Sequence, residues 1–377
     1  MSEPMEFESW QEVELYLTAS SDLTGAAFQN VDFTGMEPRL AGTILRKNLL
    51  LGCTVPPEIL ALFDAPLVFP PIPNLPFNPY RGVLYSPEEL LGAYRPGKPE
   101  TYDDTVDGAC YRQYVDQRKD GATDVRVTLA RRLHDHAISD ALQEYLAGKD
   151  VVAIMGGHFM GRDDPRYLEV ARLARDLVHA GYLPASGGGP GAMEATHLGA
   201  WFAERSDSEL EDAVAILSKA PKYTPMAGWL DAAFEVVAKY PVTSRERCDS
   251  LAIPTWLYGH EPPTCFALHI AKYFANSVRE EGLLAIAHYG VVYAPGSAGT
   301  IQEIFQDATQ NHYKTCGIVS PMIFFGRDYW TREKPVYPLL QELAAGHDYS
   351  RYLGITDDRE EVVRQVDTFA RTLDSAG

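Results

Sequence analysis

The stretch Gly290–Gln306, GVVYAPGSAGTIQEIFQ, says more about the fold than any other part of the chain. Its first four residues form an apolar run typical of a buried strand, whereas Ile301, Ile304 and Phe305 recur at helical spacing. Between the two patterns lies a Gly- and Pro-containing turn, followed by Thr300, which can cap the helix. Such a turn aims backbone N–H groups and the positive end of the helix dipole at one point. The stretch therefore predicts an α/β unit with an anion site, suited to phosphate.

Two further loops upstream have the same character. The loop Ala185–Ala195, ASGGGPGAMEA, follows a short strand-like segment and leads into a helical pattern. The loop Met155–Arg162, MGGHFMGR, ends the apolar run Val151–Ile154. One glycine-rich turn is weak evidence, because tight strand-to-helix turns use glycine for geometry alone. Three such loops in one α/β region favour a nucleotide or phosphate site.

Residues 151–325 alternate short apolar runs with amphipathic segments, which predicts an α/β fold: a doubly wound, Rossmann-like parallel sheet with helices on both faces. Loops that follow parallel strands gather at one edge of the sheet, where such folds bind ligands. The expected strands are Val151–Met155, Tyr182–Ala185, Ala213–Leu217, Thr255–Tyr258, Gly290–Ala294 and Ile318–Phe325. The expected helices are Pro165–His179, Gly191–Ala203, Phe266–Arg279, Thr300–Asn311, Pro338–Ala345 and Arg359–Leu373.

The first 148 residues differ in pattern and form a smaller N-terminal accessory region, so that residues 149–377 make up the catalytic domain with its C-terminal helices. Leu23, Phe28 and Phe33 recur every five positions, which suits either a turn of a pentapeptide-type β-solenoid or a plain loop with apolar anchors. The Pro-rich segment 65–80 is apolar and aromatic, which favours packing over a free linker. Helices are expected at Asp107–Arg118 and Val127–Ala147.

Composition indicates a soluble enzyme located in the cytoplasm. The net charge is −19 with a pI near 4.9, which argues against binding to nucleic acid. The five cysteines are scattered without a CxxC pair, which favours reduced thiols over disulfides or a zinc site. The acidic N-terminus has no apolar core, so we expect no secretory signal. No apolar run is long enough to predict a membrane span.

Two motifs resemble those of a known family. PGSAGTIQE is similar to the PGGxGTxxE signature of the LONELY GUY (LOG) family of phosphoribohydrolases, and GGGPGAMEA is similar to the companion GGGPGxMEA loop. The segment Phe274–Tyr313 resembles the larger bacterial members, which include nucleoside 5'-monophosphate nucleosidases with an added N-terminal region; such proteins were often mislabelled lysine decarboxylases. The resemblance covers about Asp150–Asp328. Ser297 stands where the family usually has a second Gly, and Glu280 where it has Lys.

The resemblance implies hydrolysis of the N-glycosidic bond in nucleoside 5'-monophosphates, either AMP-like or cytokinin riboside 5'-monophosphates, to free base and ribose 5-phosphate. Glu303 matches the motif Glu and is the expected catalytic carboxylate, able to stabilise positive charge at C1' or activate water. Its alternative role is to interact with the helix dipole. Arg279 matches the catalytic Arg and would hold phosphate or ribose through a forked contact. Its alternative is a surface Arg paired with Glu.

The remaining expected site residues lie in the three loops. Phosphate binding is assigned to Gly296, Ser297, Gly299 and Thr300, with Gly188, Gly189 and Gly191 on the opposite wall. Met193, Glu194, Gly157, His158 and Arg162 are expected to meet the base, the ribose or another part of the ligand. Met193 is equally compatible with helix packing, and His158 with a polar loop. The Pro-containing segment Tyr258–Thr264, which includes His260, is expected to border the pocket.

The sequence points to no metal site and no cofactor. The histidines are dispersed, no Lys is marked for pyridoxal chemistry, and no dinucleotide fingerprint opens the first strand–helix unit. The alternative function is a non-catalytic nucleotide sensor on the same fold, and the N-terminal region could act as a gate. The expected partner is a small-molecule nucleotide, with neither nucleic acid nor membrane. The resemblance also implies a homo-oligomer, a dimer or larger. The preferred base stays open.

Overall fold

The computed structural model describes residues 5–121, 124–259 and 261–374. The chain forms two compact units, each built from two separate segments. Unit 1 comprises residues 1–84 and 113–145, and unit 2 comprises residues 85–112 and 146–377. All three glycine-rich loops belong to unit 2.

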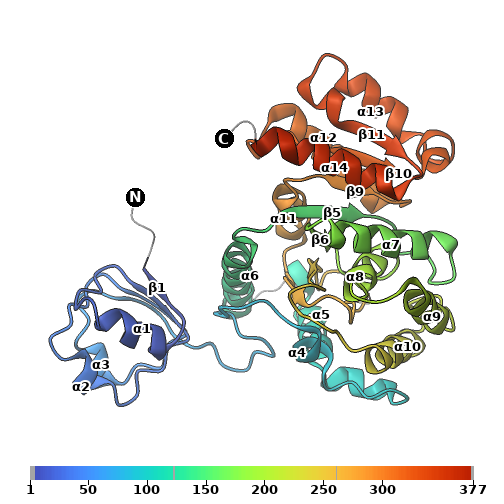
Figure 1. Ribbon diagram of the computed structural model, residues 1–377. Helices are drawn as coiled ribbons and strands as arrows, with labels where there is room; N and C mark the ends of the chain where they lie inside the picture. Colours follow the sequence, from blue (N-terminus) through green and yellow to red (C-terminus); the bar gives the residue numbers. More distant parts are fainter. Residues whose placement is uncertain (1–4, 122–123, 260, 375–377) are drawn as a thin grey trace. The chain divides into compact units, whose positions relative to one another are not determined.

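Unit 2 is built on a seven-stranded sheet in the order β11-β10-β9-β5-β6-β7-β8, and every neighbouring pair is parallel (Figure 1). Helix α7 packs against α8 and α14, whereas α11 packs against α12. The strands are β5 (Val151–Met155), β6 (Leu183–Ser186), β7 (Leu251–Ala252), β8 (His269–Ile270), β9 (Val291–Tyr293), β10 (Met322–Phe325) and β11 (Leu353–Thr356). The helices are α7 (Pro165–His179), α8 (Ala192–Trp201), α9 (Asp207–Leu217), α10 (Met226–Lys239), α11 (Asn276–Ile286), α12 (Ala298–Tyr313), α13 (Val336–Ala344) and α14 (Arg359–Asp374), with short turns at Tyr329–Glu333 and Asp348–Tyr352.

The order of the strands places a topological switch point between β5 and β9. From β5 the chain builds outward through β6, β7 and β8, then returns to β9 and builds in the other direction through β10 and β11. Met155 and Tyr293 are paired in register at the carboxyl ends of β5 and β9. A doubly wound sheet binds ligands in the crevice outside such a point. The predicted Rossmann-like α/β fold is therefore confirmed, with the glycine-rich loops following β5, β6 and β9.

Three element predictions in this unit are wrong. Residues 213–217 form the last part of helix α9, which begins at a capping box made by Ser206 and Glu209 and buries Leu210, Ala213 and Leu217 at helical spacing. Residues 255–258 contribute only one bridge, between Thr255 and Tyr273. Residues 266–275 form β8 and irregular backbone, and the helix begins only at Asn276.

Unit 1 contains a stack of parallel coils. Strands β1 (Glu6–Phe7), β2 (Ala27–Gln29), β3 (Leu49–Leu51) and β4 (Leu67–Phe69) pair in that order, so that Phe7, Phe28, Leu50 and Val68 align. Leu23, Phe28 and Phe33 are fully buried, which identifies the five-residue recurrence as the interior of a β-solenoid-like stack. The other elements are α1 (Trp10–Leu17), α2 (Glu37–Leu40), α3 (Pro57–Leu60), a turn at Lys119–Gly121 and α6 (Val125–Leu146), whose final residue lies in unit 2.

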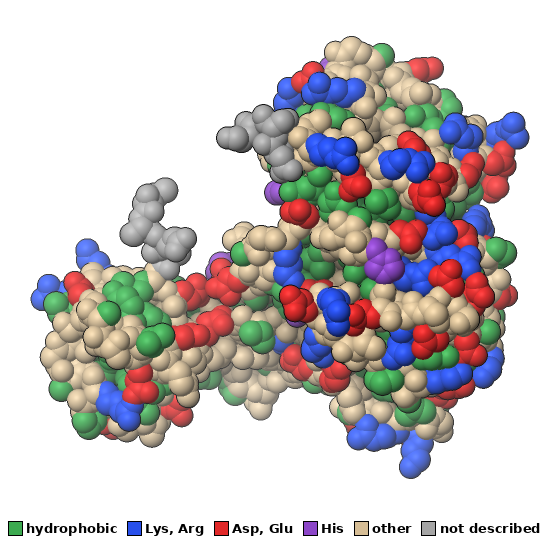
Figure 2. Space-filling model, viewed as in Figure 1, with side chains coloured by type: hydrophobic (Ala, Val, Ile, Leu, Met, Phe, Trp, Pro, Cys, Tyr) green, Lys and Arg blue, Asp and Glu red, His purple; other side chains and the backbone are tan. Residues whose placement is uncertain are grey.

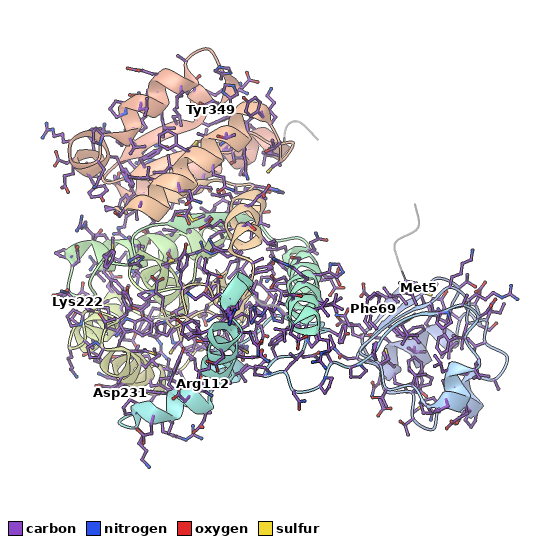
Figure 3. The ribbon with its side chains drawn as sticks, turned by 180° about the vertical axis from the view of Figure 1, so that it is seen from behind. Met5, Phe69, Arg112, Lys222, Asp231 and Tyr349 are labelled. Atoms are coloured by element: carbon purple, nitrogen blue, oxygen red, sulfur yellow. The ribbon has the colours of Figure 1, made fainter. Side chains whose placement is uncertain are left out.

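Residues 85–112 belong to unit 2, although they precede the predicted boundary near residue 148. They contain α4 (Pro87–Leu91), a 3-10 helix (Pro99–Asp104) and most of α5 (Val106–Asp116), which continues into unit 1. The Tyr94 hydroxyl donates to Asp231 of α10 at 2.8 Å (Figure 3 labels Asp231), and the buried Asp107 carboxylate accepts a 2.9 Å bond from the Trp256 indole. These long-range contacts attach the segment to the sheet unit, so the units do not divide at one position.

On the face drawn in Figure 2, Lys and Arg side chains are interspersed with Asp and Glu side chains over unit 2. No helix within the described part of the chain is long and apolar enough to cross a membrane.

Candidate functional site

The three glycine-rich loops meet at the carboxyl edge of the sheet. The Gly157 N–H donates to the Pro295 carbonyl at 3.0 Å, and the Gly157 carbonyl accepts from the Ala192 N–H at 3.3 Å. A Cβ atom on Gly157 would lie 3.2 Å from the Gly296 Cα, so the backbones approach too closely for larger residues. The sequence correctly predicted that these loops converge.

Arg279 and Glu303 lie together beside this junction. Arg279 comes from the first turn of α11, and its Nε donates to the Ile253 carbonyl at 2.8 Å. Its Nη1 is 3.6 Å from Glu303 Oε1, and the two side chains are only 9% and 13% exposed. A Cβ on Gly187 would overlap the guanidinium, so this glycine makes room for Arg279. The two predicted catalytic residues therefore form a buried pair.

The environment of Glu303 raises the pKa of its carboxyl group to about 7. Burial is the main cause, since it penalises the charged form; Arg279 opposes it, and Glu280 adds to it. A carboxyl group with a pKa near neutrality can exchange a proton at physiological pH. Glu303 is therefore suited to general acid–base chemistry, and it lies beyond the first turn of α12, which holds no acidic residue.

The first turn of α12 presents the expected anion site. Ser297 is the N-cap, its side chain makes no capping hydrogen bond, and Ser297, Ala298 and Gly299 are exposed. The first N–H groups of a helix have no partner within that helix, and they lie at the positive end of its dipole. Thr300 is buried and packs closely against Gly296. A Cβ atom on Gly296 would overlap the Thr300 hydroxyl. Ser297, Ala298 and Gly299 thus remain open to a ligand.

Three of the glycines predicted to line the site, Gly157, Gly188 and Gly191, also hold the loops together. The Gly188 N–H donates to the Ser186 hydroxyl at 3.1 Å, and the Gly188 carbonyl accepts from the Thr264 N–H at 2.9 Å. The Gly157 N–H is used by Pro295, as described above. Gly188 and Gly191 both have positive φ values, 68° and 73°, which favour glycine. Gly157 and Gly188 therefore join neighbouring loops through their backbones, and Gly191 lies so close to the Gly157 carbonyl that a Cβ on it would overlap that oxygen.

Glu194 and Arg162 were expected to face the ligand, but the structure pairs them in the interior. Arg162 donates from Nε and Nη2 to the two oxygens of Glu194 at 2.8 and 2.6 Å, and the Tyr167 hydroxyl donates to the same carboxylate at 2.9 Å. Their side chains are 1% and 0% exposed. Arg162 also lies over the Trp229 ring, with Cζ 4.3 Å from its centroid. The pair fastens the first loop to α8 and offers no free group to a ligand.

Glu261 is a site residue that sequence reasoning did not single out. Its carboxylate is 3.5 Å from Nδ1 of His158 and 3.4 Å from where a Cβ on Gly189 would lie. Burial raises its pKa to about 7, and Arg279 opposes that shift. Met193 is adjacent, because its Cε is 3.0 Å from the same Cβ position. The sequence indicated Glu261 only indirectly, because the segment Tyr258–Thr264 was expected to border the pocket. His260 of that segment lies outside the described residues.

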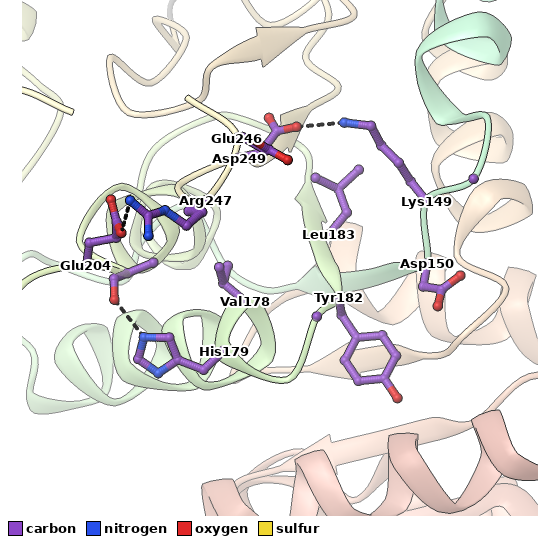
Figure 4. Close-up of a pocket in the computed structure, with 13 residues that line it drawn as sticks. Lys149, Asp150, Val178, His179, Tyr182, Leu183, Glu204, Glu246, Arg247 and Asp249 are labelled. Atoms are coloured by element: carbon purple, nitrogen blue, oxygen red, sulfur yellow. Dashed lines mark hydrogen bonds and ion pairs between the residues drawn. The ribbon is translucent and has the colours of Figure 1, made fainter. Parts of the chain in front are cut away.

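A separate cavity of about 690 Å³ lies at the opposite edge of the sheet (Figure 4). Its lining includes Lys149 and Asp150 just before β5, Tyr182 just before β6 and Asp249 just before β7. Lys149 is bonded to Asp249 at 2.7 Å. These residues precede their strands, whereas the glycine-rich loops follow theirs. The cavity is therefore distinct from the Arg279–Glu303 site.

Comparisons with known proteins identify no family for this chain and no function for this site. No protein-family model and no curated protein matches the chain. Solved structures that match part of it include the molybdenum cofactor binding protein from the phototrophic bacterium Rippkaea orientalis, at 14% identity and a TM-score of 0.36, covering 59% of this chain and 98% of that one. The Moco carrier protein from Chlamydomonas reinhardtii matches at 12% identity and a TM-score of 0.36, covering 59% and 99%. Likeness at this level carries no argument about function.

Proposed function

We propose that this protein is a phosphoribohydrolase that cleaves the N-glycosidic bond of nucleoside 5'-monophosphates, with AMP-like or cytokinin riboside 5'-monophosphates as substrates. The observation that carries the proposal is the buried Arg279–Glu303 pair, 3.6 Å apart, where three glycine-rich loops meet at the switch point of the sheet. The resemblance of PGSAGTIQE and GGGPGAMEA to the LOG motifs supports the same activity.

Each part of such a substrate has a complementary group at this site. The exposed first turn of α12 suits the 5'-phosphate, because its N–H groups and dipole favour an anion. Arg279 is permanently charged and can hold ribose or phosphate oxygens in a forked contact. Glu303, when ionised, stabilises the positive charge that develops at C1' as the base departs, and it can accept a proton from the attacking water.

The test is product analysis with purified protein and AMP, GMP, CMP, UMP or isopentenyladenosine monophosphate. We expect free base and ribose 5-phosphate in equal amounts from the wild type, and a loss of about 100-fold or more in Glu303→Gln with nucleotide binding retained. Glu281→Gln is the matched control, since Glu281 is an exposed carboxylate on α11. Nucleotide binding without release of base from any substrate would contradict the proposal and favour a nucleotide sensor.

A further inference from the structure

Hydrolysis of a nucleotide at C1' needs both a general base and a general acid. A carboxylate must be ionised to stabilise C1' and accept a proton from water, and the departing base must gain a proton because a purine anion leaves poorly. Arg279 cannot supply that proton, since a guanidinium does not deprotonate in proteins. Glu303 cannot be ionised and donate at the same moment. The proposed function therefore requires a second acid near the leaving base.

Glu261 is a second carboxyl group beside the glycine loop that contacts Arg279. Along the strip Gly187-Gly188-Gly189, the Arg279 guanidinium lies over the first glycine and the Glu261 carboxylate over the third, 3.4 Å from its Cβ position. Met193 contacts both ends of the strip, with Sδ 2.6 Å from the Cβ position on Gly187 and Cε 3.0 Å from that on Gly189. Arg279, Met193 and Glu261 therefore face the same short segment of backbone.

The loop that carries Glu261 is held firmly in this position. The Glu261 N–H donates to the Tyr258 carbonyl at 2.8 Å, and the Thr264 N–H donates to the Gly188 carbonyl at 2.9 Å. Gly259 lies against the Tyr111 ring so closely that a Cβ would overlap it. The two prolines that follow, Pro262 and Pro263, restrict the backbone further. These contacts place the backbone of Glu261 beside the glycine loop, and its carboxylate lies next to Gly189.

We propose that Glu261 is the general acid of the reaction and protonates the leaving base, a role that rests on the proposed function. The C1'–N bond breaks with its electron pair passing to the base, which takes the proton of the Glu261 carboxyl group. A water oxygen bonds to C1' and loses a proton to the Glu303 carboxylate. The products are neutral base and ribose 5-phosphate, and solvent then returns a proton to Glu261 and removes one from Glu303.

The surroundings of Glu261 support its role as a proton carrier. Burial raises the pKa of its carboxyl group to about 7, so a substantial fraction is protonated near neutrality. The described groups near it include Arg279, which lowers this pKa, His158 at 3.5 Å, and Tyr223 and Tyr258, whose own pKa values are raised mainly by burial and to a smaller extent by the charge of Glu261. Both tyrosines therefore hold their protons above the neutral range, so neither of them replaces Glu261 as a donor.

The experiment compares two substrates that differ in their need for a proton. AMP requires protonation of its leaving base, whereas p-nitrophenyl riboside 5-phosphate releases a stable phenolate without it. For Glu261→Gln we expect kcat to fall about 10²–10⁴-fold with AMP but less than about tenfold with the nitrophenyl substrate. Glu303→Gln serves as the comparison and should lose activity with both. The alkaline limb of the AMP pH profile should also disappear in Glu261→Gln.

Each other outcome overturns the assignment in a distinct way. An equal loss with both substrates, or no loss with either, would exclude Glu261 as the general acid while leaving the proposed function intact. A wild type that cleaves neither of these substrates, nor GMP, CMP, UMP or isopentenyladenosine monophosphate, would overturn the proposed function itself. Circular dichroism and melting temperature of Glu261→Gln establish that the variant is folded, and Glu261→Asp, which keeps the carboxyl group, should recover part of the lost activity.

Discussion

Replacing Glu194 by Gln would break the buried ion pair with Arg162, and we expect it to reduce stability strongly. The pair is 1% and 0% exposed, and its two charged hydrogen bonds are 2.8 and 2.6 Å long. Gln keeps the shape but leaves the guanidinium buried without a counter-charge. Breaking such a pair costs about 3–5 kcal/mol, a large share of the roughly 5–15 kcal/mol that stabilises a folded domain.

Equilibrium unfolding in urea, followed by tryptophan fluorescence, measures this loss. Trp229 is a suitable reporter, because Arg162 lies over its ring and donates to its carbonyl at 2.9 Å. The matched control is Asp164→Asn, which removes an ion pair with Arg166 whose Arg side chain is 50% exposed. Asn still caps α7, so the control should lose less than about 1 kcal/mol.

The result that would refute this reasoning is a Glu194→Gln variant as stable as the control. If that variant instead lost nucleotide affinity at unchanged stability, Glu194 would be a ligand group, as the sequence alone suggested. Adding Arg162→Met to Glu194→Gln tests the coupling: the double variant should be more stable than the sum of the two single losses implies.

Three further predictions follow from the same geometry. Gly187→Ala should displace Arg279 and lower kcat/KM by about 10–100-fold. The control is Gly282→Ala on α11, where an added Cβ meets nothing; it should leave kcat/KM unchanged and alter stability by no more than about 1 kcal/mol. Initial rates measure the activity of each variant, and melting temperatures measure its stability. Because Glu303 must be ionised and its pKa is raised to about 7, kcat/KM for AMP should fall as the pH drops through 7, and a rate independent of pH from 6 to 8 would be contrary to this. Burial lowers the pKa of His197 from 6.5 to about 3, so the contribution of its neutral form to stability is complete above pH 6.5 and is lost as the pH falls from 6.5 toward 3. Urea unfolding at several pH values should therefore show a fall in the free energy of unfolding on the order of 3–5 kcal/mol over this range. The His197→Gln variant should lack this fall.

Local patterns determined how much of the fold could be predicted. Helix α7 has the predicted bounds, Pro165–His179, because Asp164 caps it, Pro165 occupies the first helical position and one face is apolar. Residues 266–275 carry almost no polar face, since nearly all are buried, and their composition could not distinguish a helix from an edge strand and loop. The apolar run 213–217 was equally ambiguous, and the capping box before it settles the helix.

In the site, too, residues that belong to a local motif could be predicted from the sequence, whereas residues placed by distant contacts could not. Glu303 and Arg279 could be named as candidates from the sequence because each lies in or near a motif, and the structure brings the two side chains together. The role of Glu194 depends on Arg162, 32 residues earlier in another loop, and no spacing rule relates the two. The loop that carries Glu261 is placed by contacts of Thr264 with Gly188 and of Gly259 with Tyr111, which come from distant parts of unit 2. The position of a side chain that depends on tertiary contacts of this kind cannot be predicted from spacing or periodicity in the sequence.

We propose that the Arg279–Glu303 site hydrolyses the bond at C1'. The most direct test is to incubate AMP with wild type and with Glu303→Gln, and to quantify adenine, ribose 5-phosphate, adenosine and inorganic phosphate. We predict adenine and ribose 5-phosphate in a one-to-one ratio from the wild type, reduced by about 100-fold or more in the variant, with no adenosine or phosphate. Release of adenosine and phosphate, or equal release of adenine by the variant, would contradict the claim.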